Sequence, residues 1–135
     1  MDKVARHVVK YAQQLAREVN ARALVFYADA IKDDDELRRL VKAAEFPSLL
    51  VTRAKEPRVD LGAGPHRWVT IPEVPLTRAS QFRSTMLVCL ARKALRHGDR
   101  VVFLGGADGS GVIDSAFVVD VGSVPELFSL EDAAS

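Results

Sequence analysis

Three polar residues stand where two apolar runs of the sequence end. Asp29 follows the run at 23–27, Thr52 closes the run at 48–52, and Arg53 comes next. A carboxylate and a hydroxyl can hold a hydroxyl or amine group of a ligand, and a guanidinium can hold an anion. If both runs are parallel strands, their carboxyl ends meet at one sheet edge, where open α/β sheets bind ligands. We therefore predict a ligand site there. In the alternative interpretation, Asp29 and Arg53 are solvated loop charges that pair with each other.

A glycine-rich loop between two further apolar runs is the second candidate. Its backbone N–H groups could cradle a ligand. Alternatively, it is a hairpin connection in which glycine and Asp-Gly serve backbone freedom. The loop lacks the Gly-Lys-Ser/Thr of a phosphate loop and the Gly-x-Ser-x-Gly of a nucleophile elbow, so we expect no catalytic residue. The residues predicted to contact a ligand here are Gly105, Gly106, Asp108, Ser110 and Gly111.

Helices and strands that alternate along the chain would position these residues. Apolar residues at helical spacing predict helices over 3–19, 33–44 and 77–95, with Asp2, Asp33 and Thr77 as N-caps and Gly98 just past the last helix. Apolar, β-branched runs predict strands at 23–27, 48–52, 68–71, 101–104 and 114–121. The first helix is expected to bury Val4, Val8, Tyr11, Leu15 and Val19. The predicted strand core is Val25, Phe26, Leu50, Val69, Val102, Leu104 and Val118.

This alternation is typical of an α/β fold with helices on both faces of a mostly parallel sheet. The connection between the last two strands is too short for a crossover helix, so the fifth strand is predicted to be antiparallel. We therefore predict a three-layer α/β/α sandwich with a five-stranded mixed sheet of order 3-2-1-4-5. Residues 1–123 are expected to form a single domain, and 124–135 a short tail or linker.

Composition limits the functions that the sequence can support. Positive and negative charges nearly balance at +1, which argues against a nucleic-acid partner. The chain has one cysteine, Cys89, and we expect it to be a buried, unreactive thiol in a cytoplasmic protein. The three histidines lack metal-ligand spacing, so no metal and no cofactor are expected. No apolar run is long enough for a membrane helix.

Several short motifs, taken in order, resemble the C-terminal domain of pyruvate kinase. They are the strand LLVTR, the helix-to-strand junction KALRHGDRVVFLGG, the loop GSG and the final strand FVVDVG. The chain is also similar to the pyruvate-kinase-like module at the N-terminus of archaeal-type diadenylate cyclases, through its start MDKVARHVVKYAQQLA and through GVIDSAFVVDVG. The cyclase motifs Asp-Gly-Ala and Arg-His-Arg do not occur in this sequence.

The resemblance implies a regulatory domain without catalytic residues. Effector-binding pyruvate kinases hold a phosphate on a Thr/Ser-rich loop after the first strand. Here that position carries carboxylates at Asp29, Asp33 and Asp34, which would repel a phosphate.

Three functions remain open at this point. The first is a non-catalytic ligand-binding, regulatory or assembly module that accompanies a diadenylate cyclase domain. The second is a small nucleotide- or phosphate-handling enzyme that uses the loop Gly105–Gly111. The third is a purely structural oligomerisation domain. Two exposed sheet edges favour self-association, so we predict a homo-oligomer with the fifth strand or the long helix at the interface. A small molecule or nucleotide is the expected ligand.

Overall fold

A five-stranded sheet of order β3-β2-β1-β4-β5 forms the centre of the molecule. The computed structural model describes residues 3–72, 77–107 and 113–121. The first four strands are parallel, and β5 runs antiparallel to β4, which confirms the predicted topology. The strands are β1 (Ala23–Tyr27), β2 (Ser48–Thr52), β3 (Arg67–Thr70), β4 (Arg100–Gly105) and β5 (Ser115–Asp120).

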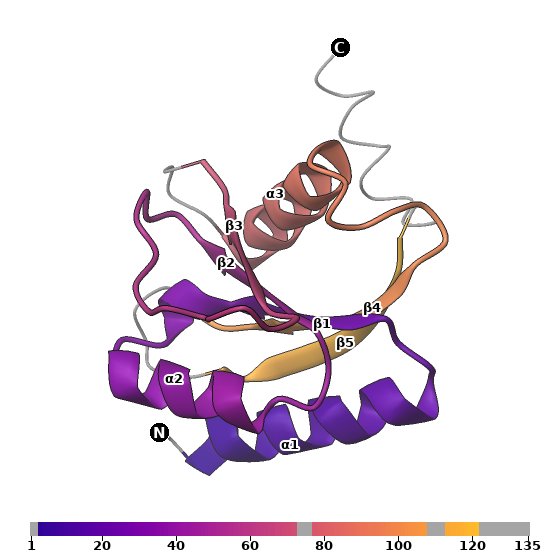
Figure 1. The fold of residues 1–135 in the computed structure, drawn as a ribbon. Coiled ribbons are helices and arrows are strands. Elements are labelled where there is room, and N and C mark those ends of the chain that lie inside the picture. The colour runs from indigo at the N-terminus through magenta and orange to yellow at the C-terminus, as the bar shows by residue number, and fades with distance from the viewer. Residues whose placement is uncertain (1–2, 73–76, 108–112, 122–135) are drawn as a thin grey trace.

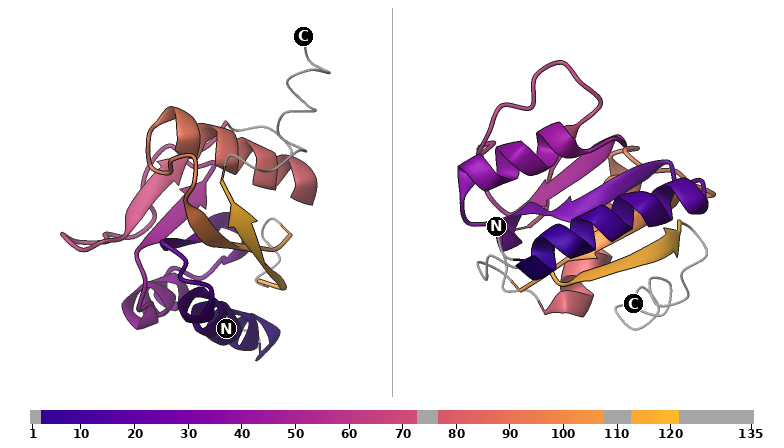
Figure 2. Two further views of the ribbon diagram at one scale, coloured as in Figure 1. Left: turned by 90° about the vertical axis from the view of Figure 1, so that its right-hand side faces the viewer. Right: turned by 90° about the horizontal axis from the view of Figure 1, so that it is seen from below.

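Helices cover both faces of this sheet, as predicted (Figure 1). Helices α1 (Lys3–Glu18) and α2 (Asp34–Ala43) lie on one face, and α3 (Arg78–Ala91) lies on the other. Figure 2 shows α1 and α2 next to each other when the sheet is seen from below. The result is a three-layer α/β/α sandwich whose central strands are shielded from water in the middle layer.

The central strands form the core, because both of their faces are covered. All five residues of β1 and of β2 are buried. The predicted core residues Val25, Phe26, Leu50, Val69, Val102 and Leu104 are each at most 5% exposed. The prediction for Val118 is wrong, since this residue is 38% exposed. It lies on the edge strand β5, which α1 covers only in part.

Helix α1 buries a different face from the predicted one. Its buried residues are Ala5, Val9, Ala12 and Ala16, one position along from the predicted stripe. Val4 and Tyr11 of that stripe are 51% and 61% exposed, while Val8, Leu15 and Val19 are partly buried. Small alanine side chains let the helix lie close to the sheet, and a pattern that weights larger apolar residues overlooks them.

Two of the three predicted N-caps, Asp33 and Thr77, are confirmed. The carboxylate of Asp33 accepts a hydrogen bond from Asp35 N, and the hydroxyl of Thr77 accepts one from Ser80 N. Asp2 lies outside the described residues.

Helix α3 ends at Ala91, earlier than predicted. Lys93 adopts a left-handed φ of 60°, and Ala94 N donates a hydrogen bond back to Cys89 O, which ends the helix. Gly98, with φ of 95°, belongs to the turn before β4 instead.

The crossover from β2 to β3 is a loop with no helix. Parallel neighbours need a long connection, usually through a helix. Here residues 53–66 make it as an irregular loop. The side chain of Arg58 holds this loop against the start of α2, where it contacts Asp34 and the backbone oxygens of Ala28 and Lys32.

Candidate functional site

Asp29, Thr52 and Arg53 lie together at the carboxyl ends of β1 and β2. Asp29 belongs to a single 3-10 turn, Ala28–Ala30, that directly follows β1. One carboxylate oxygen accepts a hydrogen bond of 2.5 Å from Thr52 Oγ1, and the other accepts one of 2.7 Å from Arg53 N. The structure thus brings together the three residues predicted at this edge. Asp29 joins the ends of two strands, because both of its carboxylate oxygens accept hydrogen bonds from the end of β2.

Tyr27 completes this cluster, and sequence reasoning did not identify it. It is the last residue of β1 and is fully buried. Burial raises the pKa of its hydroxyl, the charge of Asp29 adds to that effect, and a hydrogen bond with Arg53 acts against it. The phenol therefore stays protonated at neutral pH and serves as a hydrogen-bonding group. Its position, as the one polar end of an otherwise apolar strand, is the sequence signal that could have singled it out.

Gly105 and Gly106, the first two glycines of the glycine-rich loop, lie at the carboxyl end of β4. Gly105 closes β4 and is paired with Ser115 of β5. A Cβ on Gly105 would lie 3.1 Å from the Phe103 ring, so a larger residue here would require that ring to shift by a few tenths of an ångström. Gln81 of α3 is buried and donates a hydrogen bond of 3.3 Å to Gly106 O.

Both described glycines of this loop are therefore held by protein contacts. Gln81 is a second residue that the sequence analysis missed. The remaining predicted contacts, Asp108, Ser110 and Gly111, lie outside the described residues. The ligand-binding role of the loop stays a prediction.

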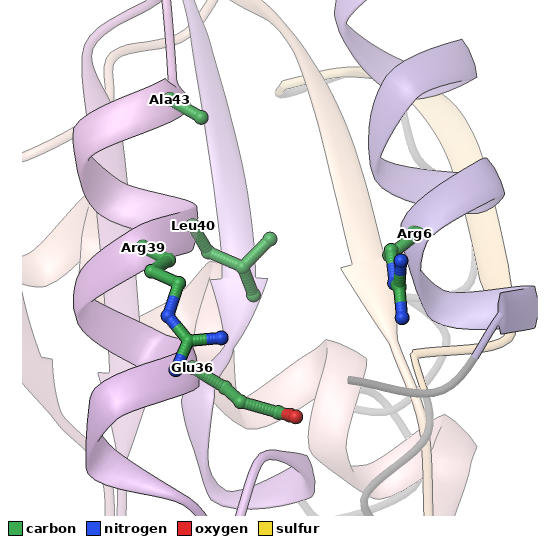
Figure 3. Close-up of a pocket in the computed structure, with 5 residues that line it drawn as sticks. All are labelled: Arg6, Glu36, Arg39, Leu40 and Ala43. Atoms are coloured by element: carbon green, nitrogen blue, oxygen red, sulfur yellow. The ribbon is translucent and has the colours of Figure 1, made fainter.

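A groove between α1 and α2 was not predicted from the sequence. It has a volume of about 350 Å³ and is lined by Arg6, Glu36, Arg39, Leu40 and Ala43. Figure 3 shows Arg6 on α1 and the other four residues on α2, with the Glu36 side chain extending toward the gap. Leu40 is buried and gives the groove an apolar wall, while the two arginines and the glutamate give it a charged rim. Such a surface suits side-chain contacts from another protein segment better than the chemistry of a reaction.

Reactive groups are few in the part of the chain that the structure describes. Cys89 is fully buried in α3, and burial raises the pKa of its thiol to about 11, so the sulfur stays protonated at neutral pH. Among residues 3–72, 77–107 and 113–121, no group of three or more histidines, cysteines and acidic residues could hold a metal ion. Within the same ranges, none of the helices has the length and apolar character needed to span a membrane.

Comparison with known proteins identifies one family and one fold. The family described as "Probable sensor domain DacZ_P" matches residues 5–128. Among solved structures, the chain is similar to a pyruvate kinase from Cryptosporidium parvum, with a TM-score of 0.61 and 15% sequence identity. The match covers 90% of this chain and 23% of the pyruvate kinase, so the chain spans about a quarter of that enzyme and shares its fold over that part. No curated protein matches the chain.

Proposed function

This chain belongs to the family of probable DacZ_P sensor domains, and from that membership we propose that it is a non-catalytic regulatory module that accompanies a diadenylate cyclase domain. The family match spans nearly the whole described domain and carries the proposal. The fold supports it, since the same arrangement occurs in pyruvate kinase as about a quarter of a larger chain. The described strand-end residues also act as hydrogen-bonding and packing groups rather than as an activated nucleophile or base.

We further propose that the module binds its ligand at the carboxyl edge of the sheet, near Asp29, Thr52, Arg53 and the loop Gly105–Gly111. Tyr27 and Arg53 support this, because a buried phenol and a guanidinium next to the Asp29 carboxylate form a preorganised polar cluster. Since Asp29 already accepts two hydrogen bonds, Arg53 is the group that would meet an anionic part of the ligand.

Thermal unfolding in the presence of small ligands tests this proposal. The purified chain would be heated with nucleotides and phosphorylated metabolites. A ligand present at about 100 times its dissociation constant adds about 2.7 kcal/mol to the free energy of unfolding, which raises Tm by several degrees. Arg53→Gln should abolish this rise, and Arg22→Gln, at an arginine near the opposite ends of the strands, should leave it unchanged. Catalytic turnover of any of these compounds would contradict a non-catalytic module and would favour the enzyme alternative.

Assembly is a second candidate function, and the edge strand β5 favours it. Among the described strands β5 pairs only with β4, so its outer side is an open edge. Phe117 and Val118 on this strand are 40% and 38% exposed, and Val4 and Tyr11 are exposed on the adjoining helix α1. An open edge with apolar neighbours is a typical surface for self-association. We therefore propose a homo-oligomer with β5 at its interface.

A further inference from the structure

A cavity that is open to solvent lies against the loop that joins β2 to β3, and its lining includes none of the residues of the strand-end cluster. Its volume is about 550 Å³, within the range of small-molecule pockets. Three parts of the fold line it: Arg38 on α2, the loop segment 57–62, and residues 66–68 at the start of β3. Residues from separate elements thus converge on one hollow, as they do in many ligand sites.

The walls of this cavity are held in place by protein contacts. The Arg58 guanidinium donates to Asp34 Oδ1 at 2.8 and 3.0 Å, and to the backbone oxygens of Ala28 and Lys32 at 3.0 Å each. Trp68 Nε1 donates a hydrogen bond of 3.0 Å to the backbone oxygen of Val59, whose side chain is buried. The loop is therefore fixed at two points, and it offers a shaped site without large rearrangement.

Three arginines and one carboxylate line the cavity, and two of the arginines are available for a ligand. The carboxylate is that of Asp60, which accepts a hydrogen bond of 2.8 Å from Gly62 N within the loop. Arg58 is used in its contacts with Asp34 and the two backbone oxygens. Arg38 pairs with Asp35, but both side chains are more than half exposed, so water and ligands compete readily with this pair. Arg67 is exposed at the first position of β3. The side chains of Arg38 and Arg67 can thus both turn toward an anion in the cavity.

Two aromatic side chains complete the lining. The half-buried indole of Trp68 borders the cavity and is fixed by its bond to Val59. His66 Nδ1 is buried and has no hydrogen-bond partner among the described residues. Burial also lowers the pKa of His66, so at neutral pH the ring offers a hydrogen bond rather than a charge.

We propose that this cavity binds a phosphomonoester that carries a planar ring, with the phosphate between Arg38 and Arg67 and the ring against Trp68. A phosphomonoester carries a charge of about −1.5 to −2 at neutral pH, which matches two guanidinium groups. An indole face stacks well on a planar ring. This site goes beyond the proposed function, because it lies outside the strand-end cluster and needs none of its residues.

Trp68 is the sole tryptophan of the chain, so tryptophan fluorescence reports on the indole that borders this cavity. The purified protein would be titrated with adenosine 5′-monophosphate, ribose 5-phosphate, adenosine and benzoate. The nucleotide should change the Trp68 emission along a saturable curve, and each of the other three should bind at least about tenfold more weakly, because each lacks the ring, the phosphate or the second charge. The absence of a saturable change up to about 1 mM nucleotide would overturn the proposal, as would ribose 5-phosphate binding as tightly as the nucleotide.

Neighbouring arginines on α2 provide a matched control. Arg38→Gln and Arg67→Gln should each weaken nucleotide binding about tenfold, the effect of losing one charge-assisted hydrogen bond. Arg39→Gln removes the same charge from the next residue, which lines the α1–α2 groove instead, and it should leave the dissociation constant unchanged. Arg53→Gln at the strand ends should also leave it unchanged. Equal weakening by all four substitutions would show non-specific attraction and would overturn the site.

Discussion

The carboxylate of Asp29 accepts a hydrogen bond of 2.5 Å from the hydroxyl of Thr52, which joins the turn after β1 to the last residue of β2. The same hydroxyl accepts a bond of 3.0 Å from Ala54 N at the start of the long loop. Thr52 is almost fully buried, so neither contact competes with much water. One side chain therefore holds together two strand ends and the first residues of the crossover.

Thr52→Val should destabilise the protein by about 1–3 kcal/mol. The substitution leaves a carboxylate oxygen of Asp29 and the Ala54 N–H without their partner in a largely buried place. Urea unfolding measures the loss. Thr70→Val is the control, because Thr70 on β3 is the direct neighbour of Thr52 on β2 and is only half-buried. It should cost less than about 0.5 kcal/mol, and an equal loss in both variants would show that the Asp29 contact is unimportant.

Val102→Asp should abolish folding, because Val102 is fully buried in β4 and an unpaired buried charge costs several kcal/mol. Its cross-strand partner Val118 provides the contrast. Val118 is 38% exposed, and Val118→Asp should therefore remain soluble and melt cooperatively. Circular dichroism during heating distinguishes the two. A cooperative melt of the Val102→Asp variant would refute the placement of Val102 in the core.

Asp99 should make stability depend on pH in the acidic range. Although burial acts to raise the pKa of Asp99, the Arg96 backbone N–H and the Arg22 guanidinium outweigh it and lower this pKa. The stabilising contribution is therefore present above the unfolded pKa of about 3.9 and is lost as pH falls through the folded pKa. Asp99→Asn should cost about 1 kcal/mol at pH 7 and progressively less as the pH falls through the folded pKa of Asp99.

Urea midpoints across this pH range measure the contribution of Asp99. Asp35→Asn, at a mostly exposed carboxylate that pairs with Arg38, is the control and should cost less than about 0.5 kcal/mol at pH 7. A loss in the Asp99 variant that stays constant between pH 3 and pH 7 would contradict the assigned role.

Self-association through β5 should appear in the molar mass. Light scattering of the purified chain should give at least a dimer, and Val118→Asp should shift it toward the monomer, since a charge on the exposed face of the edge strand opposes pairing. Leu87→Asp, at an exposed position on α3, tests the other predicted interface, the long helix. It should lower the molar mass only if α3 forms the contact between subunits. A monomer mass for the unaltered chain at high concentration would refute the assembly.

Cys89 should resist thiol reagents in the folded protein. Its thiol is fully buried, and a pKa of about 11 leaves roughly one thiolate in a thousand molecules at pH 8. Reaction with a chromogenic disulfide should be slow in buffer and fast in denaturant. Rapid reaction of the native protein would mean that α3 opens readily around this residue.

The sequence by itself determined the topology and the strand-end cluster. Runs such as those ending at Tyr27 and Thr52 are apolar on both faces, so they had to be central strands, and parallel strands bring Asp29, Thr52 and Arg53 to one edge. Strand order followed from the helices and short connections between the runs. These inferences depend on local patterns that neighbouring residues impose on the backbone.

Only the tertiary structure decided which face of α1 is buried and where the loop cavity forms. Ala5 and Ala12 are buried in place of Val4 and Tyr11 because close contact with the sheet favours small side chains, which no single-helix pattern reveals. The loop cavity depends on Arg58, whose partners lie 24 to 30 residues earlier in the chain. Such contacts between distant residues form only when the chain is folded, so spacing in the sequence carries no trace of them.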